Sequence, residues 1–204
     1  GDVYASSGYY DEAVYGLNMV RRSVDNGLTW TAAGALPDLD PGPGVIQAID
    51  YVEGFVVAPS DNNRLYMAGG GLVTSADAGA NWTSIPLPPQ CYASKAVPSQ
   101  ANAVSLWVIC DNTIYRTDDA SVAAPVWVAM GAASNNFTVN GTDNAQAATL
   151  ALHPNYPVTQ HVVVGTQFGG FLRTTNNGTL WLERNDGLES TTIRALARQL
   201  CSIA

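Results

Sequence analysis

An eight-residue segment that ends in tryptophan recurs along the chain. Its three complete copies are Ser23–Trp30, Ser75–Trp82 and Thr174–Trp181, which share the pattern Ser/Thr-x-Asp/Asn-x-Gly-x-x-Trp. A degenerate fourth copy, Thr117–Trp127, carries extra residues before its tryptophan and has no glycine. The four tryptophans lie 52, 45 and 54 residues apart. Because a repeat of this period places each copy in one structural unit, it constrains the fold more than any other feature of the sequence. We call this segment the box.

The residues of the box suit a tight turn between two strands. Asp and Asn side chains accept hydrogen bonds from the amides of their own turn, and glycine adopts the positive φ that such a turn needs. The tryptophan is expected to open the next strand and to pack back across the hairpin. A structural role is therefore expected for the box residues Ser23, Asp25, Gly27, Trp30, Ser75, Asp77, Gly79, Trp82, Thr117, Asp119, Trp127, Thr174, Asn176, Gly178 and Trp181.

The segments around the boxes predict an all-β protein. Each box follows two short apolar runs, rich in β-branched and aromatic residues, that are separated by a tight turn. A period of about 40–50 residues with about four short strands is typical of a β-propeller blade. We expect one domain over residues 1–204, with blades at 2–33 plus 190–199, 45–86, 92–130 and 145–183.

The pattern of the box resembles the Asp-box, or BNR, repeat. This repeat occurs in sialidases, sortilin-type receptors, xyloglucan-cleaving endoglucanases and propellers of the photosystem II assembly-factor type. The resemblance implies a β-propeller built from four-stranded antiparallel blades. It implies no single function, because these families perform unrelated tasks.

The first blade lacks a first strand ahead of residue 2, and two arrangements follow. In one, the segment 190–199 supplies that strand and closes a ring of four blades, which covers the exposed strand edges. In the other, the same segment begins a fifth blade of a larger propeller, as the larger blade number of most Asp-box propellers implies. The sequence alone leaves both open, with a slight preference for the closed ring.

Composition and charge restrict the partners. Hydrophobic residues make up 47% of the 204 residues, charged residues only 13%, and the net charge is −8. Such a surface repels phosphate backbones, so we expect no nucleic-acid partner. The apolar runs are far shorter than the ~18–20 residues of a membrane span, so none is expected. The low charge favours an extracellular or cell-surface protein, and four glycosylation sequons occur, at Asn81, Asn136, Asn140 and Asn177.

The cysteines allow two interpretations. Cys91 and Cys110 are close enough in sequence to form a disulfide in an oxidising compartment, but they also suit buried thiols, and Cys201 is left over. No cysteine or histidine spacing matches a zinc site. Asp38 and Asp40 have the spacing of a calcium loop without its remaining ligands, so we expect no metal there. No cofactor motif is found, and none is expected.

The best candidate for a binding site is the insert at 8–18, where other blades have a tight turn. It combines aromatic faces with carboxylates, which suits stacking on a sugar or contact with a peptide. The alternative is a surface insertion that packs its own tyrosines. The candidate binding residues are Tyr9, Tyr10, Asp11, Glu12 and Tyr15.

Catalytic residues are not evident. A sialidase needs clustered arginines, but Arg22, Arg116 and Arg173 each precede a box and thus occupy a repeated strand position. A xyloglucanase-like enzyme needs two opposed carboxylates, and nothing in the sequence pairs Asp11, Glu12, Asp50 or Glu53. His153 and His161 are expected to be structural or exposed.

These observations favour a non-catalytic extracellular scaffold that binds protein subunits or glycans. Its blade edges would also allow association into homo- or hetero-oligomers. The alternative is a fragment of a sialidase-like or xyloglucanase-like glycoside hydrolase. An enzyme should bring carboxylates or arginines together at one mouth of the central channel, and a scaffold should not.

Overall fold

The structure is a computed structural model that describes residues 1–6, 20–37, 52–111, 113–130, 137–139 and 142–196. All regular elements in these ranges are β-strands. No helix in the described part of the chain has the length and apolar character needed to cross a bilayer.

The strands form four larger antiparallel sheets, which we call blades 1 to 4 in chain order. Blade 1 contains β1 (Val3–Ser6), β2 (Val20–Ser23) and β3 (Thr31–Ala32); blade 2 contains β4 (Gly54–Ala58), β5 (Asp61–Gly69), β6 (Gly71–Ser75) and β7 (Thr83–Ser84). Blade 3 contains β8 (Ala93–Pro98), β9 (Leu106–Cys110), β10 (Thr113–Thr117) and β11 (Val128–Met130); blade 4 contains β14 (Ala147–Leu152), β15 (Val162–Thr166), β16 (Phe171–Thr174) and β17 (Leu182–Glu183). A small hairpin of β12 (Phe137–Val139) and β13 (Thr142–Ala145) lies between blades 3 and 4 in the chain.

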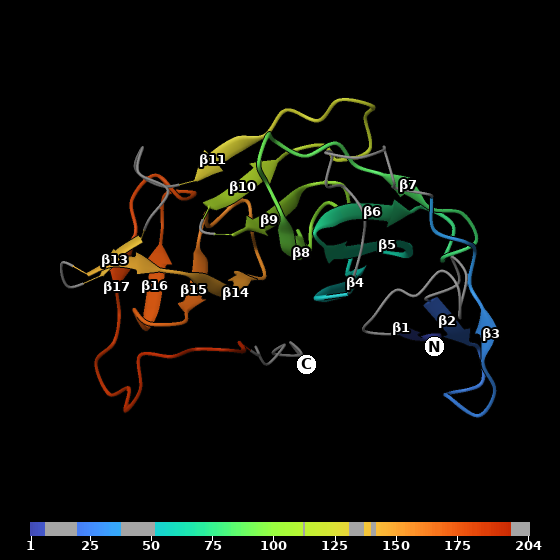
Figure 1. The fold of residues 1–204 in the computed structure, drawn as a ribbon, viewed down its shortest axis with the longest axis horizontal. Helices are drawn as coiled ribbons and strands as arrows, with labels where there is room; N and C mark the ends of the chain where they lie inside the picture. The colour runs from blue at the N-terminus through green and yellow to red at the C-terminus, as the bar shows by residue number, and fades with distance from the viewer. Residues whose placement is uncertain (7–19, 38–51, 112, 131–136, 140–141, 197–204) are drawn as a thin grey trace.

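The blades stand side by side along an open arc (Figure 1). Within each complete blade the strands follow one another in chain order, from the first to the fourth. The first strands, β4, β8 and β14, lie on the inner side of the arc, and the fourth strands, β7, β11 and β17, lie on its outer side. This is the radial arrangement of a β-propeller, so the predicted all-β propeller fold is confirmed.

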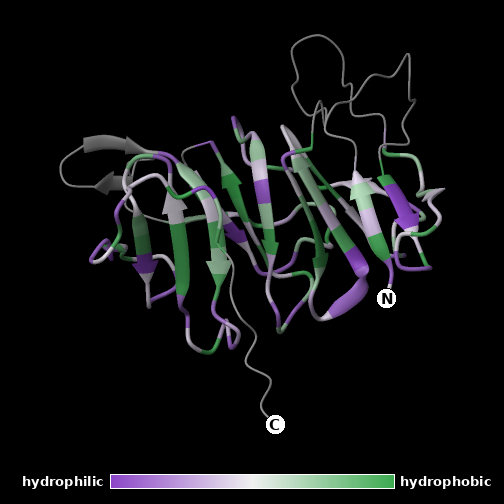
Figure 2. Cartoon of the chain, turned by 90° about the horizontal axis from the view of Figure 1, so that it is seen from below, coloured by the Kyte–Doolittle hydropathy of each residue, from purple (hydrophilic) through white to green (hydrophobic). Residues whose placement is uncertain are grey.

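The hydrophobic core lies between the blades. Strand interiors are apolar and the connecting loops are polar (Figure 2). Three buried clusters fill the three spaces between adjacent blades, because alternate residues of each middle strand point to opposite neighbours. In blade 2, Leu65 and Met67 pack toward blade 1, whereas Tyr66 and Ala68 pack toward blade 3. The corresponding cluster between blades 3 and 4 centres on Trp107, which is fully buried.

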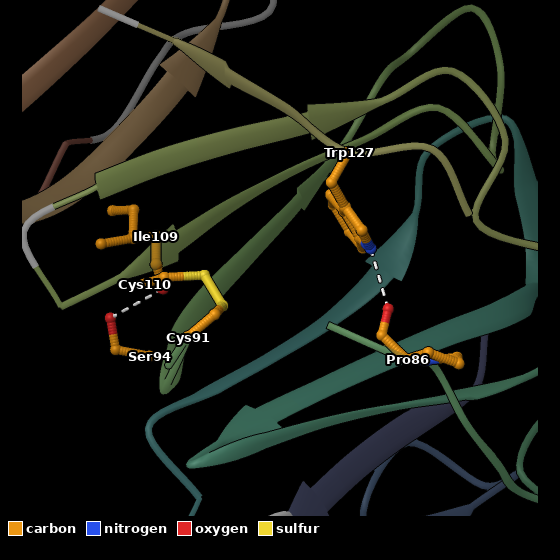
Figure 3. The surroundings of a disulfide bond; sticks show 6 residues. All are labelled: Pro86, Cys91, Ser94, Ile109, Cys110 and Trp127. Carbon is orange, nitrogen blue, oxygen red and sulfur yellow. Dashed lines mark hydrogen bonds between the residues drawn. A yellow bond between two sulfur atoms is a disulfide. The ribbon is translucent and has the colours of Figure 1, made fainter. Parts of the chain in front are cut away.

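The boxes of blades 2, 3 and 4 also contact the preceding blade, through the segment at the end of that blade's fourth strand. We call this segment, the third and fourth residues after a box tryptophan, the exit segment. Gly34 in the exit segment of blade 1 donates its backbone N–H to the carbonyl of Gly79, in the box of blade 2, at 2.6 Å. The carbonyl of Pro86 in the exit segment of blade 2 accepts a hydrogen bond from Trp127 Nε1, in the box of blade 3, at 2.8 Å (Figure 3). The box therefore joins blades as well as strands.

The box glycine allows this close approach. Gly178 has φ +82°, and a Cβ at that position would come within 2.9 Å of Met130 Cβ, in the exit segment of blade 3. Gly79 has φ +88°, and its Cβ would meet Ala33 Cβ at 3.4 Å. Glycine thus satisfies both the positive φ of the turn and the contact between blades.

The described part of blade 1 has three strands, β1, β2 and β3, as expected of a blade without a first strand ahead of residue 2. The segment 190–196 forms no strand with blade 1; instead, Thr191 and Ile193 form backbone hydrogen bonds with Gly170 and Thr166 of blade 4. The arc drawn in Figure 1 consequently stays open between blade 1 and the C-terminal segment.

Candidate functional site

The three complete boxes share one hydrogen-bonded turn. In each, the side-chain oxygen of the third residue accepts the backbone N–H of the seventh: Asp25 from Thr29 at 2.9 Å, Asp77 from Asn81 at 2.8 Å, and Asn176 from Leu180 at 3.0 Å. The first residue's hydroxyl accepts the glycine N–H at 2.8 Å in the first two boxes and at 3.0 Å in the third. The expected turn hydrogen bonds are therefore present, and the side-chain oxygen of the third residue has a structural role in each of the three complete boxes.

The carboxylates of the boxes are held ionised by these bonds. The Thr29 hydroxyl and backbone N–H, followed by the Ser23 hydroxyl, lower the pKa of Asp25 to about 2. The Asn81 side chain and backbone lower the pKa of Asp77, and Ser121 does the same for Asp119 in the degenerate box. A carboxylate that is ionised and occupied by its own turn is a poor general acid.

The three repeated arginines do not form one pocket. Arg22 on β2 pairs with Asp2, and Arg116 on β10 pairs with Asp118 at 3.1 Å. Arg173 lies on β16, in a different blade again, and its Nη2 is 3.4 Å from His161 Nδ1. The arginine cluster that a sialidase requires is thus not formed by these three side chains.

The remaining sequence candidates have mixed outcomes. The rings of His153 and His161 contact each other edge to face at 5.5 Å. Among the sequons, Asn81 donates from Nδ2 to Asp77 at 2.6 Å and Asn177 accepts from the Tyr156 hydroxyl at 2.6 Å, so both asparagines belong to box turns and their glycosylation stays a prediction. Several candidates lie outside the described residues: Tyr9, Tyr10, Asp11, Glu12, Tyr15, Asp38, Asp40, Asp50, Asn136, Asn140 and Cys201.

A depression of about 540 Å³ lies at one end of the inner strands. We call it the inner-edge depression. Glu53 and Gly70 line it from blade 2, the segment Tyr92–Lys95 and Asp111 from blade 3, and the segment Gln146–Ala148 and Gln167 from blade 4. Three blades contribute because the start of each first strand and the turn after each second strand meet at the same end of the sheets. Its size is within the range of roughly 300–1,000 Å³ of known ligand sites.

Two carboxylates line this depression, and they differ from those of the boxes. Partial burial raises the pKa of Asp111 above its usual value, and a hydrogen bond from the Tyr92 backbone opposes this by a smaller amount. The backbone N–H of Asp111 bonds to the Tyr92 carbonyl at 3.3 Å. Glu53 is exposed, and its backbone carbonyl accepts a hydrogen bond from Lys95 Nζ at 2.9 Å. This bond engages the only lysine of the chain.

A disulfide supports the blade 3 side of the depression. Cys91 and Cys110 are bonded with a Cα–Cα distance of 4.9 Å (Figure 3). The next residue after each, Tyr92 and Asp111, lines the depression. The structure thus shows the disulfide and not the pair of buried thiols. The crosslink ties the start of β8 to the end of β9 and fixes the positions of these two rim residues.

The sequence did not point to Asp111 or to the depression. Asp111 lies in the turn between β9 and β10, where its φ is +48°. The other lining residues come from turns and strand starts that are distant in sequence. Only the arrangement of the blades brings them together.

Comparisons with known proteins bear on the fold. No family model matches the sequence, and no curated protein does either. Among solved structures, YCF48 from Cyanidioschyzon merolae is similar with a TM-score of 0.60 and 12% identity, covering 85% of this chain and 55% of that one. The Niastella koreensis GH74 enzyme is similar with a TM-score of 0.57 and 18% identity, covering 89% and 27%. A structure of YCF48 bound to D1 peptide has a TM-score of 0.54 and 16% identity, covering 89% and 57%.

These similarities establish the propeller fold alone, because all identities are low. The chain spans between about a quarter and just over half the length of these three structures. The neighbours include an enzyme class and a peptide-binding protein, so they do not decide between the two functions that the sequence leaves open.

Proposed function

We propose that the chain is a non-catalytic binding module built from Asp-box repeats, and that its inner-edge depression receives a segment of a partner protein. The observation that carries the proposal is the depression itself, formed by three blades on a rigid, disulfide-supported rim. The shared turns of the three boxes support the Asp-box assignment. Rigid frames that present turns around a channel suit recognition.

The chemistry of the depression favours a ligand that donates hydrogen bonds. Its rim carries the carboxylates of Glu53 and Asp111 and the side-chain amides of Gln146 and Gln167. The net charge of −8 also attracts cationic partners. An extended peptide with backbone N–H groups and a lysine or arginine side chain offers these donors. That YCF48 has been solved with a bound peptide is consistent with such a use of the fold.

We also propose that the protein is extracellular. The disulfide between Cys91 and Cys110 is of the kind that persists in oxidising compartments. Partners would then be extracellular proteins or their glycans.

A peptide array and a glycan array test the proposal directly. We expect cationic decapeptides to bind and acidic decapeptides of the same length not to bind. Asp111→Asn should weaken the best peptide about tenfold, which corresponds to about 1.4 kcal/mol. Asp186→Asn, an exposed charge-matched change outside the depression, should leave binding unchanged. Binding that survives Asp111→Asn, or that occurs only to glycans, would contradict a peptide site here.

One observation favours a second function, that of a glycoside hydrolase fragment. Glu53 and Asp111 share one depression at the inner edge, and burial raises the pKa of Asp111. A carboxyl group with a raised pKa beside a second carboxylate is the pattern of an acid and its partner in glycosidases. Turnover of a sialoside or of xyloglucan that is abolished by Asp111→Asn would establish this function and refute the non-catalytic one.

A further inference from the structure

The box of blade 3 departs from the other boxes in its hydrogen bonds as well as in its sequence. In a complete box, the third residue accepts the backbone N–H of the seventh, as Asp77 does from Asn81. In blade 3, Asp119 Oδ1 instead accepts the backbone N–H of Ser121, two residues on, at 2.8 Å. Ser121 also stands where the complete boxes have glycine, and additional residues precede the tryptophan. The turn is therefore closed early, and the additional residues lie outside it.

These residues form an exposed apolar segment, 122–126, with the sequence VAAPV, which we call the valine loop. Val122 is 47% exposed, Val126 is 78% exposed, and Ala123 and Ala124 between them are exposed as well. None of the backbone or side-chain groups of the loop forms a hydrogen bond with another described residue. Water therefore satisfies the backbone groups of the loop, and moving the loop breaks no hydrogen bond within the described part of the chain.

Both ends of the valine loop are fixed to the protein. Before the loop, Ala120 is buried and donates its backbone N–H to the Val104 carbonyl at 2.8 Å. After the loop, Trp127 Nε1 donates to the Pro86 carbonyl at 2.8 Å (Figure 3). The strand β11 then begins at Val128 and pairs with β10. The loop thus projects from two fixed points, so a change within it leaves the contacts of the blade in place.

Small aliphatic side chains in a segment without hydrogen bonds suit the cleft of one class of protease. Exposed loops are the preferred sites of proteolytic cutting, and an extended peptide binds through backbone groups that it does not use elsewhere. Serine proteases differ in the pocket that holds the side chain before the cut bond, and a small pocket selects small aliphatic residues. The loop has no lysine, arginine or aromatic residue. Proteases with an acidic pocket or a large apolar pocket therefore find no match in it.

The two fixed ends select one peptide bond of the loop, that between Ala123 and Ala124. Cutting after Val126 would require Trp127 to leave its hydrogen bond and the apolar cluster between blades 2 and 3 against which it packs. The bond after Ala124 leads into Pro125, whose ring restricts the backbone and removes the N–H. The bond between Ala123 and Ala124, by contrast, joins two ordinary residues and has residues without hydrogen bonds on both sides.

We propose that a serine protease with a small aliphatic pocket cuts the chain in the valine loop, at the Ala123–Ala124 bond. The serine of the protease takes up the Ala123 acyl group and releases the Ala124 amine, and water then frees the Ala123 carboxylate. The disulfide Cys91–Cys110 lies wholly before the cut, so it does not join the two pieces. The pairing of β10 with β11 and the buried cluster between blades 3 and 4 hold them together. The product is a folded protein of two chains, and both chains line the inner-edge depression.

Limited digestion of the full chain in native buffer tests the site. Elastase, trypsin and chymotrypsin are compared at equal molar concentration, and mass spectrometry identifies the first bond that each cuts. We expect elastase to cut first between Ala123 and Ala124. The two pieces should separate on a denaturing gel without reductant and should elute together from a sizing column, at the volume of the intact 21.5 kDa chain. A first elastase cut at any other bond, no elastase cut, cutting of the loop by trypsin or chymotrypsin, or separation of the pieces in native buffer would overturn the proposal.

A pair of glutamate variants distinguishes the valine loop from exposure alone. Ala123→Glu places a charge where the small apolar pocket must bind it, so the first cut should slow at least about tenfold. Val158→Glu is the matched control, because Val158 is 88% exposed but lies in a turn that the Gln160 N–H closes by bonding to the Pro157 carbonyl at 3.2 Å. This control should leave the rate of the first cut unchanged. Cutting of the Ala123→Glu chain in the loop at the wild-type rate, or equal slowing by both variants, would contradict recognition of this segment.

Discussion

At the scale of single residues, one oxygen atom at the third position of the box organises the turn. Asp25, Asp77 and Asn176 all direct Oδ1 to the backbone N–H at the seventh position. Aspartate adds a second acceptor oxygen, which takes the Thr29 hydroxyl at 2.5 Å and Asn81 Nδ2 at 2.6 Å. The hydrogen bond from the backbone N–H of the seventh residue is therefore common to the three complete boxes. Only the two boxes with aspartate add a negative charge.

This difference predicts acid sensitivity of the first two boxes. The folded-state pKa of Asp25 is about 2, below the 3.8 of an unperturbed aspartate, and the pKa of Asp77 is also lowered. Their stabilisation is therefore present above pH 3.8 and is lost as the pH falls toward 2. In urea unfolding between pH 4 and 2, the double variant Asp25→Asn/Asp77→Asn should take up fewer protons on unfolding than the wild type, because it lacks both carboxyl groups with a lowered pKa. Asp186→Asn serves as the control, and an unchanged slope in the double variant would contradict the prediction.

At the scale of elements, the box is a hairpin turn and a contact between blades at once. Its hydrogen bonds and strands could be predicted from sequence, because they depend on residues within one hairpin. The contact between blades could not, because Gly34 and Gly79, or Pro86 and Trp127, are more than 40 residues apart. For the same reason Trp30 and Trp82 look equivalent in sequence and differ in burial. The predicted binding insert lies outside the described residues, so it stays a prediction.

A pair of glycine substitutions separates these two roles of the box. Gly178 and Gly187 both have φ +82°, but a Cβ on Gly187 would meet no atom within 4 Å, whereas one on Gly178 would meet Met130. Gly187→Ala should therefore lower the free energy of unfolding by only about 1–2 kcal/mol, the cost of a left-handed alanine. Gly178→Ala should cost a further roughly 1–3 kcal/mol for overpacking. Chemical denaturation measures both, and equal losses would show that the contact with blade 3 contributes little.

At the scale of the whole molecule, stability is distributed unevenly along the arc. Each blade contacts only its neighbours, so blades at the ends of the array have fewer stabilising interfaces than blades in the middle. The second strands of blades 1 and 3 reflect this: β9 is buried along its whole length, whereas β1 is half-exposed. The disulfide adds a crosslink in blade 3, one of the two middle blades.

Hydrogen exchange should follow this gradient. Local opening of blade 1 disrupts one interface between blades, whereas opening of blade 3 disrupts two and strains the disulfide. The backbone amides of β1–β3 should therefore exchange at least about tenfold faster than those of β9. Uniform exchange across the four blades would mean that the arc opens as one cooperative unit. This result would contradict the expectation that each blade is stabilised only by its neighbours.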